Sequence, residues 1–177
     1  MLLSLLLTAA TVSAKLDEQS SSFRFVTEKR VGEAVIGRWE KADGTLHIRN
    51  DGQRQVTITL QANSVEVNGS PMQTKLARSD LMFSAQKYPV IEFRSDWHPA
   101  GLLRTGGEIS GIATMRGVTH NERFQVLPAR CERPGVDCDI EVKGEINRER
   151  YGLRSLGGML RPNVELTMKV RFTPVGT

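Results

Sequence analysis

Residues 164–172 read VELTMKVRF, and apolar side chains at every second position alternate with polar ones along the whole stretch. Residues 56–62 (VTITLQA) and 140–146 (IEVKGEI) repeat this pattern. Because successive side chains of a strand point to opposite faces of a sheet, each stretch predicts a strand with one apolar face and one wet face.

Weaker forms of the alternation predict further strands, and pairs of turn residues such as Gly106-Gly107 separate them. These strands are expected at residues 23–27, 34–39, 45–49, 90–97, 108–116 and 123–127. Many short amphipathic strands in one chain favour an antiparallel barrel or sandwich. The chain has 177 residues, enough for one domain with a sizeable core.

One stretch departs from the two-residue period. Ser70-Pro71-Met72-Gln73 places a capping hydroxyl first, proline at the first helical position and glutamine at the third. We therefore expect one or two short helices within residues 71–85, inserted between strands.

Small residues occupy several positions that face inward or nearly so, and they favour a cavity inside the sheet. A barrel of about eight strands can be filled by its own side chains or can hold one small ligand. The small residues in question are Ala34, Gly37, Ala62, Gly111, Ala113 and Gly144. The alternative is that the glycines mark bulges and bends of the strands.

The first 14 residues, MLLSLLLTAATVSA, combine a leucine-rich run with small residues at its end. This composition is typical of a secretory signal peptide with its cleavage site, and the run is too short to span a bilayer as a helix. A buried N-terminal helix is the alternative. We interpret residues 1–14 as a signal peptide, 15–22 as a polar linker and 23–174 as the folded domain. Such a protein would be exported.

The two cysteines, Cys131 and Cys138, bracket a Pro-Gly pair that marks a turn. In an exported protein this spacing predicts a disulfide. Two free thiols remain an alternative, and a zinc site would need two further ligands nearby.

Charge and motifs disfavour several classes of function. The formal net charge is +4 and the basic residues are scattered, whereas nucleic-acid binders usually gather them into a patch. His47, His98 and His120 do not belong to a recognised catalytic or metal-binding motif, and the sequence contains no nucleophile elbow or phosphate loop. We therefore expect no catalysis, no metal site and no nucleic-acid partner.

Three strings, in order along the chain, resemble segments of the YceI-like family. Residues 87–95 (KYPVIEFRS), preceded by Phe83, resemble that family's "F…KYP.I.F.S" segment. Residues 111–120 (GIATMRGVTH) resemble its "G.LTIRGVTK" strand and turn, and residues 146–152 (INRERYG) resemble "INR.DFG". The chain departs from the pattern at Ala113, Met115, His120, Glu149-Arg150 and Tyr151.

The resemblance implies an eight-stranded, antiparallel, lipocalin-like β-barrel in the periplasm that encloses an apolar cavity. It also implies a long-chain isoprenoid lipid or isoprenoid quinone as ligand, with no further cofactor. A carrier of this kind would make transient contact with a membrane surface, as a monomer or a homodimer. The side chains expected to contact the lipid are Phe25, Ile36, Ile58, Leu60, Met72, Leu76, Phe83, Ile91, Phe93, Ile109, Met115, Leu166 and Met168.

The sequence alone therefore leaves three candidate functions. The first is non-catalytic binding, storage or transport of an isoprenoid lipid. The second is a periplasmic enzyme acting on a lipid-like substrate, which would need a histidine or carboxylate with a partner inside the cavity. The third is a stress-response barrel with a filled interior that acts through protein partners.

Overall fold

The computed structural model describes residues 12–175 and is built around a single antiparallel sheet. In chain order the strands are β1 (Val12–Leu16), β2 (Ser22–Lys29), β3 (Val35–Trp39), β4 (Ala42–Ile48), β5 (Gln53–Gln61), β6 (Val65–Val67), β7 (Val90–Ser95), β8 (His98–Pro99), β9 (Gly107–Met115), β10 (Val118–Val126), β11 (Ile140–Asn147), β12 (Leu160–Val170) and β13 (Phe172–Pro174). The helices are α1 (Pro71–Arg78) and α2 (Leu102–Thr105), with short 3₁₀ turns η1 (Ala62–Ser64) and η2 (Arg148–Tyr151).

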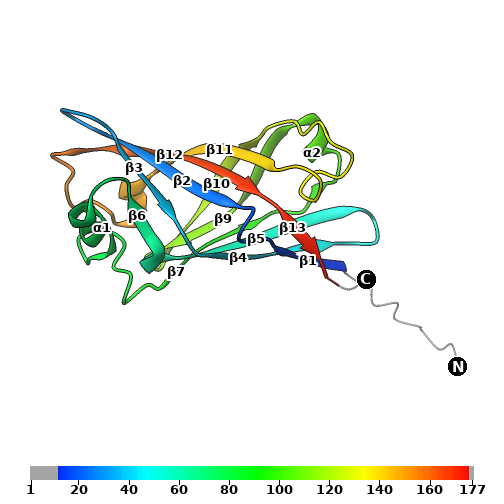
Figure 1. The fold of residues 1–177 in the computed structure, drawn as a ribbon, viewed down its shortest axis with the longest axis horizontal. Helices are drawn as coiled ribbons and strands as arrows, with labels where there is room; N and C mark the ends of the chain where they lie inside the picture. The colour runs from blue at the N-terminus through cyan, green and yellow to red at the C-terminus, as the bar shows by residue number, and fades with distance from the viewer. Residues whose placement is uncertain (1–11, 176–177) are drawn as a thin grey trace, which may run out of the picture.

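The expected all-β antiparallel architecture is confirmed, but the expected count of eight strands is wrong. The sheet has 13 strands in the order β13-β1-β4-β5-β7-β9-β10-β11-β12-β2-β3-β6, with β8 paired beside β5. It curls into a half-barrel, with α1 at one end of the long axis and α2 at the other (Figure 1). The extra strands, β1, β6, β8 and β13, have only two to five residues, too few for a two-residue period to stand out.

Every strand predicted from alternation has a counterpart in the sheet. In β10 the buried residues Glu122, Phe124 and Val126 alternate with exposed ones, as expected for a sheet with one dry face. Strands β9 and β10 pair over nine residues and join through Arg116 and Gly117, both with positive φ. A two-residue turn of this kind matches the twist of the paired strands.

The N-terminal boundary differs from the sequence interpretation. Residues 1–11 of the predicted signal peptide lie outside the described residues. Residues 12–14 form β1 together with Lys15 and Leu16, which had been placed in the linker. Strand β1 pairs with β4 on one side and β13 on the other, and the buried Leu16 belongs to the core.

The core is the concave face of the sheet, because the inward-facing residues of most strands are apolar and buried. It extends from Leu103 of α2 at one end to Ala77 of α1 at the other, and it takes in Tyr151 and Leu153 from the loop after β11. Cavities remain beside both helices, one inside the sheet next to α1 and one between α2, β1, β13 and the loop after β10.

Candidate functional site

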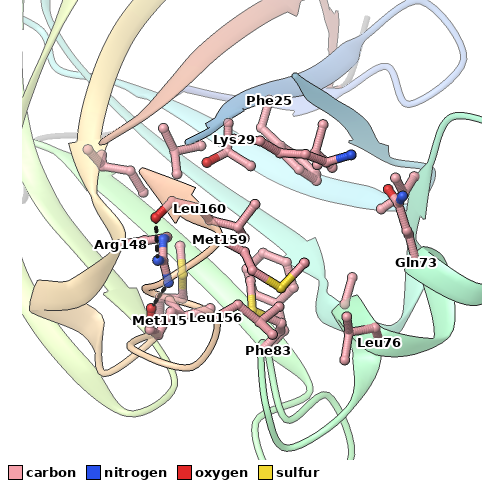
Figure 2. A pocket seen from close by; sticks show the side chains of 18 of the residues that line it. Phe25, Lys29, Gln73, Leu76, Phe83, Met115, Arg148, Leu156, Met159 and Leu160 are labelled. Carbon is pink, nitrogen blue, oxygen red and sulfur yellow. Dashed lines mark hydrogen bonds between the residues drawn. The ribbon is translucent and has the colours of Figure 1, made fainter. Parts of the chain in front are cut away.

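An apolar cavity of about 180 Å³ lies inside the curled sheet at the α1 end. Figure 2 shows Arg148 and Leu160 on one side, Gln73 and Leu76 of α1 on the other, and Met159 between them. The lining residues are Phe25, Thr27, Lys29, Val35, Trp39, Val67, Gln73, Leu76, Ala77, Met82, Phe83, Met115, Ile146, Arg148, Leu153, Leu156, Met159, Leu160, Val164 and Leu166. Met159 is 61% exposed, so the cavity reaches the surface there.

Helix α1 forms one wall, and its start was predicted correctly. The Ser70 hydroxyl accepts a hydrogen bond from the Gln73 N–H (3.2 Å), and proline follows at the first helical position. The Thr74 side chain ties the helix to β6 through hydrogen bonds to the backbone of Val67. The second helix allowed for in residues 79–85 is a series of turns instead.

The opposite wall is a loop that a buried arginine holds in place. The Arg148 side chain is 3% exposed, and its guanidinium donates to the carbonyls of Arg161, Leu153, Ser155 and Leu160. The Glu149 carboxylate lies 4.0 Å away, and burial lowers the pKa of Arg148. The arginine therefore anchors residues 153–161, and its N–H groups are engaged by protein atoms.

A second, smaller cavity of about 70 Å³ adjoins the first deeper in the sheet. Trp39, Met115, Ile146 and Leu166 line both cavities, so these four side chains separate the two spaces. The interior is therefore neither an open tunnel nor a solidly packed core.

Most of the predicted lipid-contacting residues lie along these two cavities. Phe25, Leu76 and Phe83 line the first; Ile58, Leu60, Ile91, Phe93 and Met168 line the second; Met115 and Leu166 line both. Ile109 is buried in the core of β9 but lines neither cavity.

Two further residues of the predicted set line neither cavity. Ile36 belongs to the outer face of β3 and is 36% exposed, because Val35, Gly37 and Trp39 are the residues that face inward. Met72 is 80% exposed, since α1 turns Gln73, Leu76 and Ala77 toward the cavity instead.

The small residues do not open the cavity as expected. A Cβ at Gly37 would overlap the Phe25 ring, one at Gly144 would overlap Phe124, and one at Gly111 would lie 2.7 Å from Phe93 Cζ. Each glycine is thus covered by a phenylalanine. Ala34 is exposed before β3, Ala62 is fully buried, and Ala113 alone of the set lines a cavity.

Several lining residues were not anticipated. Thr27 and Trp39 follow the same two-residue period as Phe25 and Gly37, so extending the alternation along β2 and β3 would have found them. Leu153, Leu156 and Met159 come from an irregular loop that has no periodicity to read.

Two polar atoms in the wall of the first cavity have no hydrogen-bond partner among the described residues. They are Thr27 Oγ1 and Trp39 Nε1, on side chains that are 5% and 7% exposed. Lys29, half-buried, and Arg148 are the charged residues of the lining.

Tyr151, one of the departures from the family pattern, is fully buried beside the second cavity. Its hydroxyl donates to Glu122 Oε1 (2.7 Å), and Arg150 Nη1 lies 3.3 Å from the same oxygen. Burial and the hydrogen bond to Glu122 raise the pKa of Tyr151. The phenol, the carboxylate and the guanidinium therefore satisfy one another.

The histidines lie outside both cavities. His98 is buried in β8, His120 Nε2 lies 3.0 Å from the Arg150 carbonyl, and His47 belongs to β4. Within residues 12–175, no group of three or more His, Cys, Asp or Glu side chains is placed to hold a metal ion. No helix in the same part of the chain is long and apolar enough to cross a membrane.

The predicted disulfide is confirmed. Cys131 and Cys138 are bonded, with Cα atoms 6.2 Å apart, in the loop between β10 and β11. Disulfides persist in oxidising compartments, so the bond is consistent with a location outside the cytoplasm.

Solved structures with the same fold support this architecture. BcnA of Burkholderia cenocepacia aligns with a TM-score of 0.70 and 17% identity, over 88% of this chain and 98% of BcnA. A polyisoprenoid binding domain from Saccharophagus degradans aligns with a TM-score of 0.66 and 18% identity, over 93% of this chain and 99% of that domain. The YceI protein of Campylobacter jejuni gives a TM-score of 0.60 and 16% identity, over 81% and 87% of the two chains.

No curated protein matches the chain in sequence. A family model does: residues 15–172 match the YceI-like domain, which covers both cavities and the disulfide loop. This chain belongs to the YceI-like family.

Proposed function

We propose that this protein binds a long apolar lipid, a polyisoprenoid or an isoprenoid quinone, and stores or carries it in the periplasm without changing it chemically. The observation that carries the proposal is the apolar cavity at the α1 end, bounded by β2, β3, β12 and α1. Membership of the YceI-like family supports it, as does the shared fold with a polyisoprenoid binding domain.

The lining supplies the energy for binding a hydrocarbon. Burying one CH₂ contributes about 0.8 kcal/mol, so a five-carbon isoprene unit contributes on the order of 4 kcal/mol before the cost of ordering the chain. Few polar contacts are then needed, which agrees with a wall made mostly of Phe, Leu, Met and Val side chains.

A long chain needs more room than the cavity offers, because binding sites for drug-sized ligands usually measure about 300–1,000 Å³. Met82, Met115 and Met159 line the cavity, and methionine side chains adapt readily to the shape of a ligand. We expect the lipid to displace Met115 and its neighbours and so to join the first cavity to the second.

The surface around the cavity suits a brief contact with a membrane. Val31, Met72, Leu81 and Met159 are each at least half exposed. The β2–β3 connection that carries Val31 lies at the same end of the molecule as α1 (Figure 1). An apolar rim of this kind would let the lipid pass from a bilayer into the cavity without crossing water.

Native mass spectrometry of protein purified from the periplasm without added lipid tests the proposal. We expect a bound mass that organic extraction releases and that matches a polyprenyl lipid or quinone. After delipidation, the protein should rebind such a lipid with a rise in Tm that grows with lipid concentration. Protein that is isolated empty and rejects added polyprenyl lipids would refute the proposal.

Export is part of the same proposal. We expect the mature chain to begin at Lys15, to fractionate with the periplasm and to contain no free thiol. N-terminal sequencing and thiol titration of the denatured, unreduced protein measure these properties. A chain that retains Met1 and stays in the cytoplasm would contradict export.

A further inference from the structure

The cavity contains two hydrogen-bonding groups that the protein itself leaves unused. Thr27 Oγ1 and Trp39 Nε1 are buried, both residues line the first cavity, and neither atom has a hydrogen-bond partner among the described residues. Native proteins pair nearly all of their buried polar groups, so two unpaired ones in one apolar cavity need an explanation.

Neither side chain is free to turn toward solvent. The Trp39 ring packs against Phe25, with ring centroids 5.0 Å apart, and against Phe83, with centroids 5.6 Å apart. Thr27 lies in the middle of β2, paired with Val35 on one side and Val164 on the other. The two groups are therefore held in place for whatever enters the cavity.

The two groups lie at different depths. Trp39 pairs with Phe23 of β2, four residues from Thr27 along that strand. At about 3.3 Å per residue, the backbone positions of Trp39 and Thr27 differ by about 13 Å along the strand direction. The length of the indole ring reduces this distance for the two polar groups themselves. Trp39 also borders the second cavity, so the deeper donor lies where the two cavities meet.

The chemistry of the donors selects the partner. An indole N–H can only donate, and a threonine hydroxyl can donate as well as accept, so an oxygen acceptor satisfies both. A charged oxygen would be costly among apolar walls, and the Arg148 guanidinium nearby is already bonded to four backbone carbonyls. A neutral carbonyl, ether or hydroxyl oxygen fits best.

We infer that Thr27 and Trp39 form a polar subsite inside the cavity, which holds neutral oxygen atoms of the lipid and draws its oxygenated end inward. This inference rests on the proposed lipid-binding function and adds an orientation to it: the oxygen-bearing ring enters, and the hydrocarbon tail follows toward the rim. A bare hydrocarbon leaves both donors unpaired, and a phosphate-bearing end stays outside near Lys29.

Affinity measurements on delipidated full-length protein test the subsite. The probes are decylubiquinone, which carries carbonyl and ether oxygens, and decylbenzene, which has the same alkyl chain without oxygen. Thr27→Val removes the hydroxyl and keeps the side-chain volume, and Thr59→Val on the outer face of β5 is the matched control. We expect Thr27→Val to weaken decylubiquinone binding about 5- to 10-fold, as for the loss of one buried hydrogen bond, and to leave decylbenzene binding unchanged within about twofold.

Fluorescence reports on the deeper donor. Trp39 and Trp97 are the two tryptophans, so a Trp97→Phe background isolates the emission of Trp39. Decylubiquinone should quench this emission at saturation, and decylbenzene should not. A quinone ring held at the surface near Lys29 would leave Trp39 unquenched and would overturn the inward orientation.

The outcomes separate the inference from the proposed function. Wild-type protein that binds neither probe refutes both. If the wild-type protein binds both probes and Thr27→Val weakens the binding of both equally or not at all, the polar subsite is refuted. The proposed carrier function is then unaffected. The Tm of the empty Thr27→Val protein must stay at or above that of wild type, since an unpaired buried hydroxyl is being replaced by a methyl group.

Discussion

Among single residues, Arg148 holds one wall of the cavity in place. Its guanidinium bonds four carbonyls of the 153–161 segment, which has no regular secondary structure before β12. Loop carbonyls need partners when they are buried, and one arginine supplies several of them at once. The residue therefore shapes the wall of the cavity without offering its charge to the ligand.

Arg148→Met tests this role, because methionine keeps an unbranched stem but cannot donate hydrogen bonds. We expect the free energy of unfolding to fall by about 3 kcal/mol or more, since several buried carbonyls lose their partners. Amide exchange in residues 153–160 should accelerate. The exposed Arg154, changed to methionine, is the control and should alter stability by less than about 0.5 kcal/mol. Equal effects of the two changes would contradict the anchoring role.

His98 gives the fold a pH dependence. It is buried in β8 and paired in register with Arg54 of β5. Burial lowers its pKa below the ordinary 6.5, the neighbouring Arg54 lowers it further, and a hydrogen bond to the Pro99 carbonyl partly opposes them. As the pH falls through 6.5, the unfolded chain takes up the proton before the folded one does. Stability present above pH 6.5 is therefore lost on acidification.

Thermal unfolding at pH 7.5 and pH 5.5 measures this effect. From pH 7.5 to pH 5.5, the Tm of the wild-type protein should fall further than the Tm of the His98→Gln variant, because the variant has no titrating group at that position. Most carboxylates titrate below this range and change little. A His98→Gln variant with the same pH dependence as wild type would show that His98 is not responsible.

At the scale of elements, the sheet closes its inner face by pairing glycines with phenylalanines on the neighbouring strand. Gly37 of β3 faces Phe25 of β2 in register, and Gly144 of β11 accommodates the ring of Phe124 from β10. Each ring occupies the space that a side chain at the glycine would need. These glycines thus make room for phenylalanine rings, and the volume of the cavity arises elsewhere.

Gly37→Ala tests the pairing. The added methyl would overlap the Phe25 ring and lie 2.7 Å from the Glu66 carbonyl oxygen, so we expect a loss of about 2 kcal/mol or more in unfolding free energy. Gly101→Ala, where nothing lies within 4 Å of the new atom, is the control and should be neutral or slightly stabilising. Chemical denaturation of both variants makes the comparison. A tolerated Gly37→Ala would mean that Phe25 moves freely.

At the level of the whole molecule, hollows border both helices: the apolar cavity lies beside α1, and another hollow lies between α2, β1, β13 and the loop after β10. Helix α1 covers the apolar cavity and turns Leu76 and Ala77 into it, while Met72 on the far side of the helix remains exposed. One short helix thus separates the binding space from the surface around it.

Ala77→Phe should fill the cavity from this helix. We expect lipid affinity to drop at least tenfold, with stability changed by no more than about 2 kcal/mol, because the new ring occupies existing space at some packing cost. Lys75→Phe adds the same ring at an exposed position of α1 that does not line the cavity, and it should leave affinity unchanged. Titration calorimetry with a polyprenyl lipid measures both. Unaltered binding by Ala77→Phe would place the lipid outside this cavity.

Features that depend on near neighbours in the chain follow from the sequence alone: the alternating strands, the capped start of α1 and the disulfide. Contacts between distant strands decided the rest, including the count of 13 strands, the inward turn of Trp39 rather than Ile36, and the anchoring by Arg148. The physical reason is that a two-residue period shows which side chains share a face. Only the curl of the sheet decides which face is enclosed, and only packing between strands decides where that enclosed space remains empty.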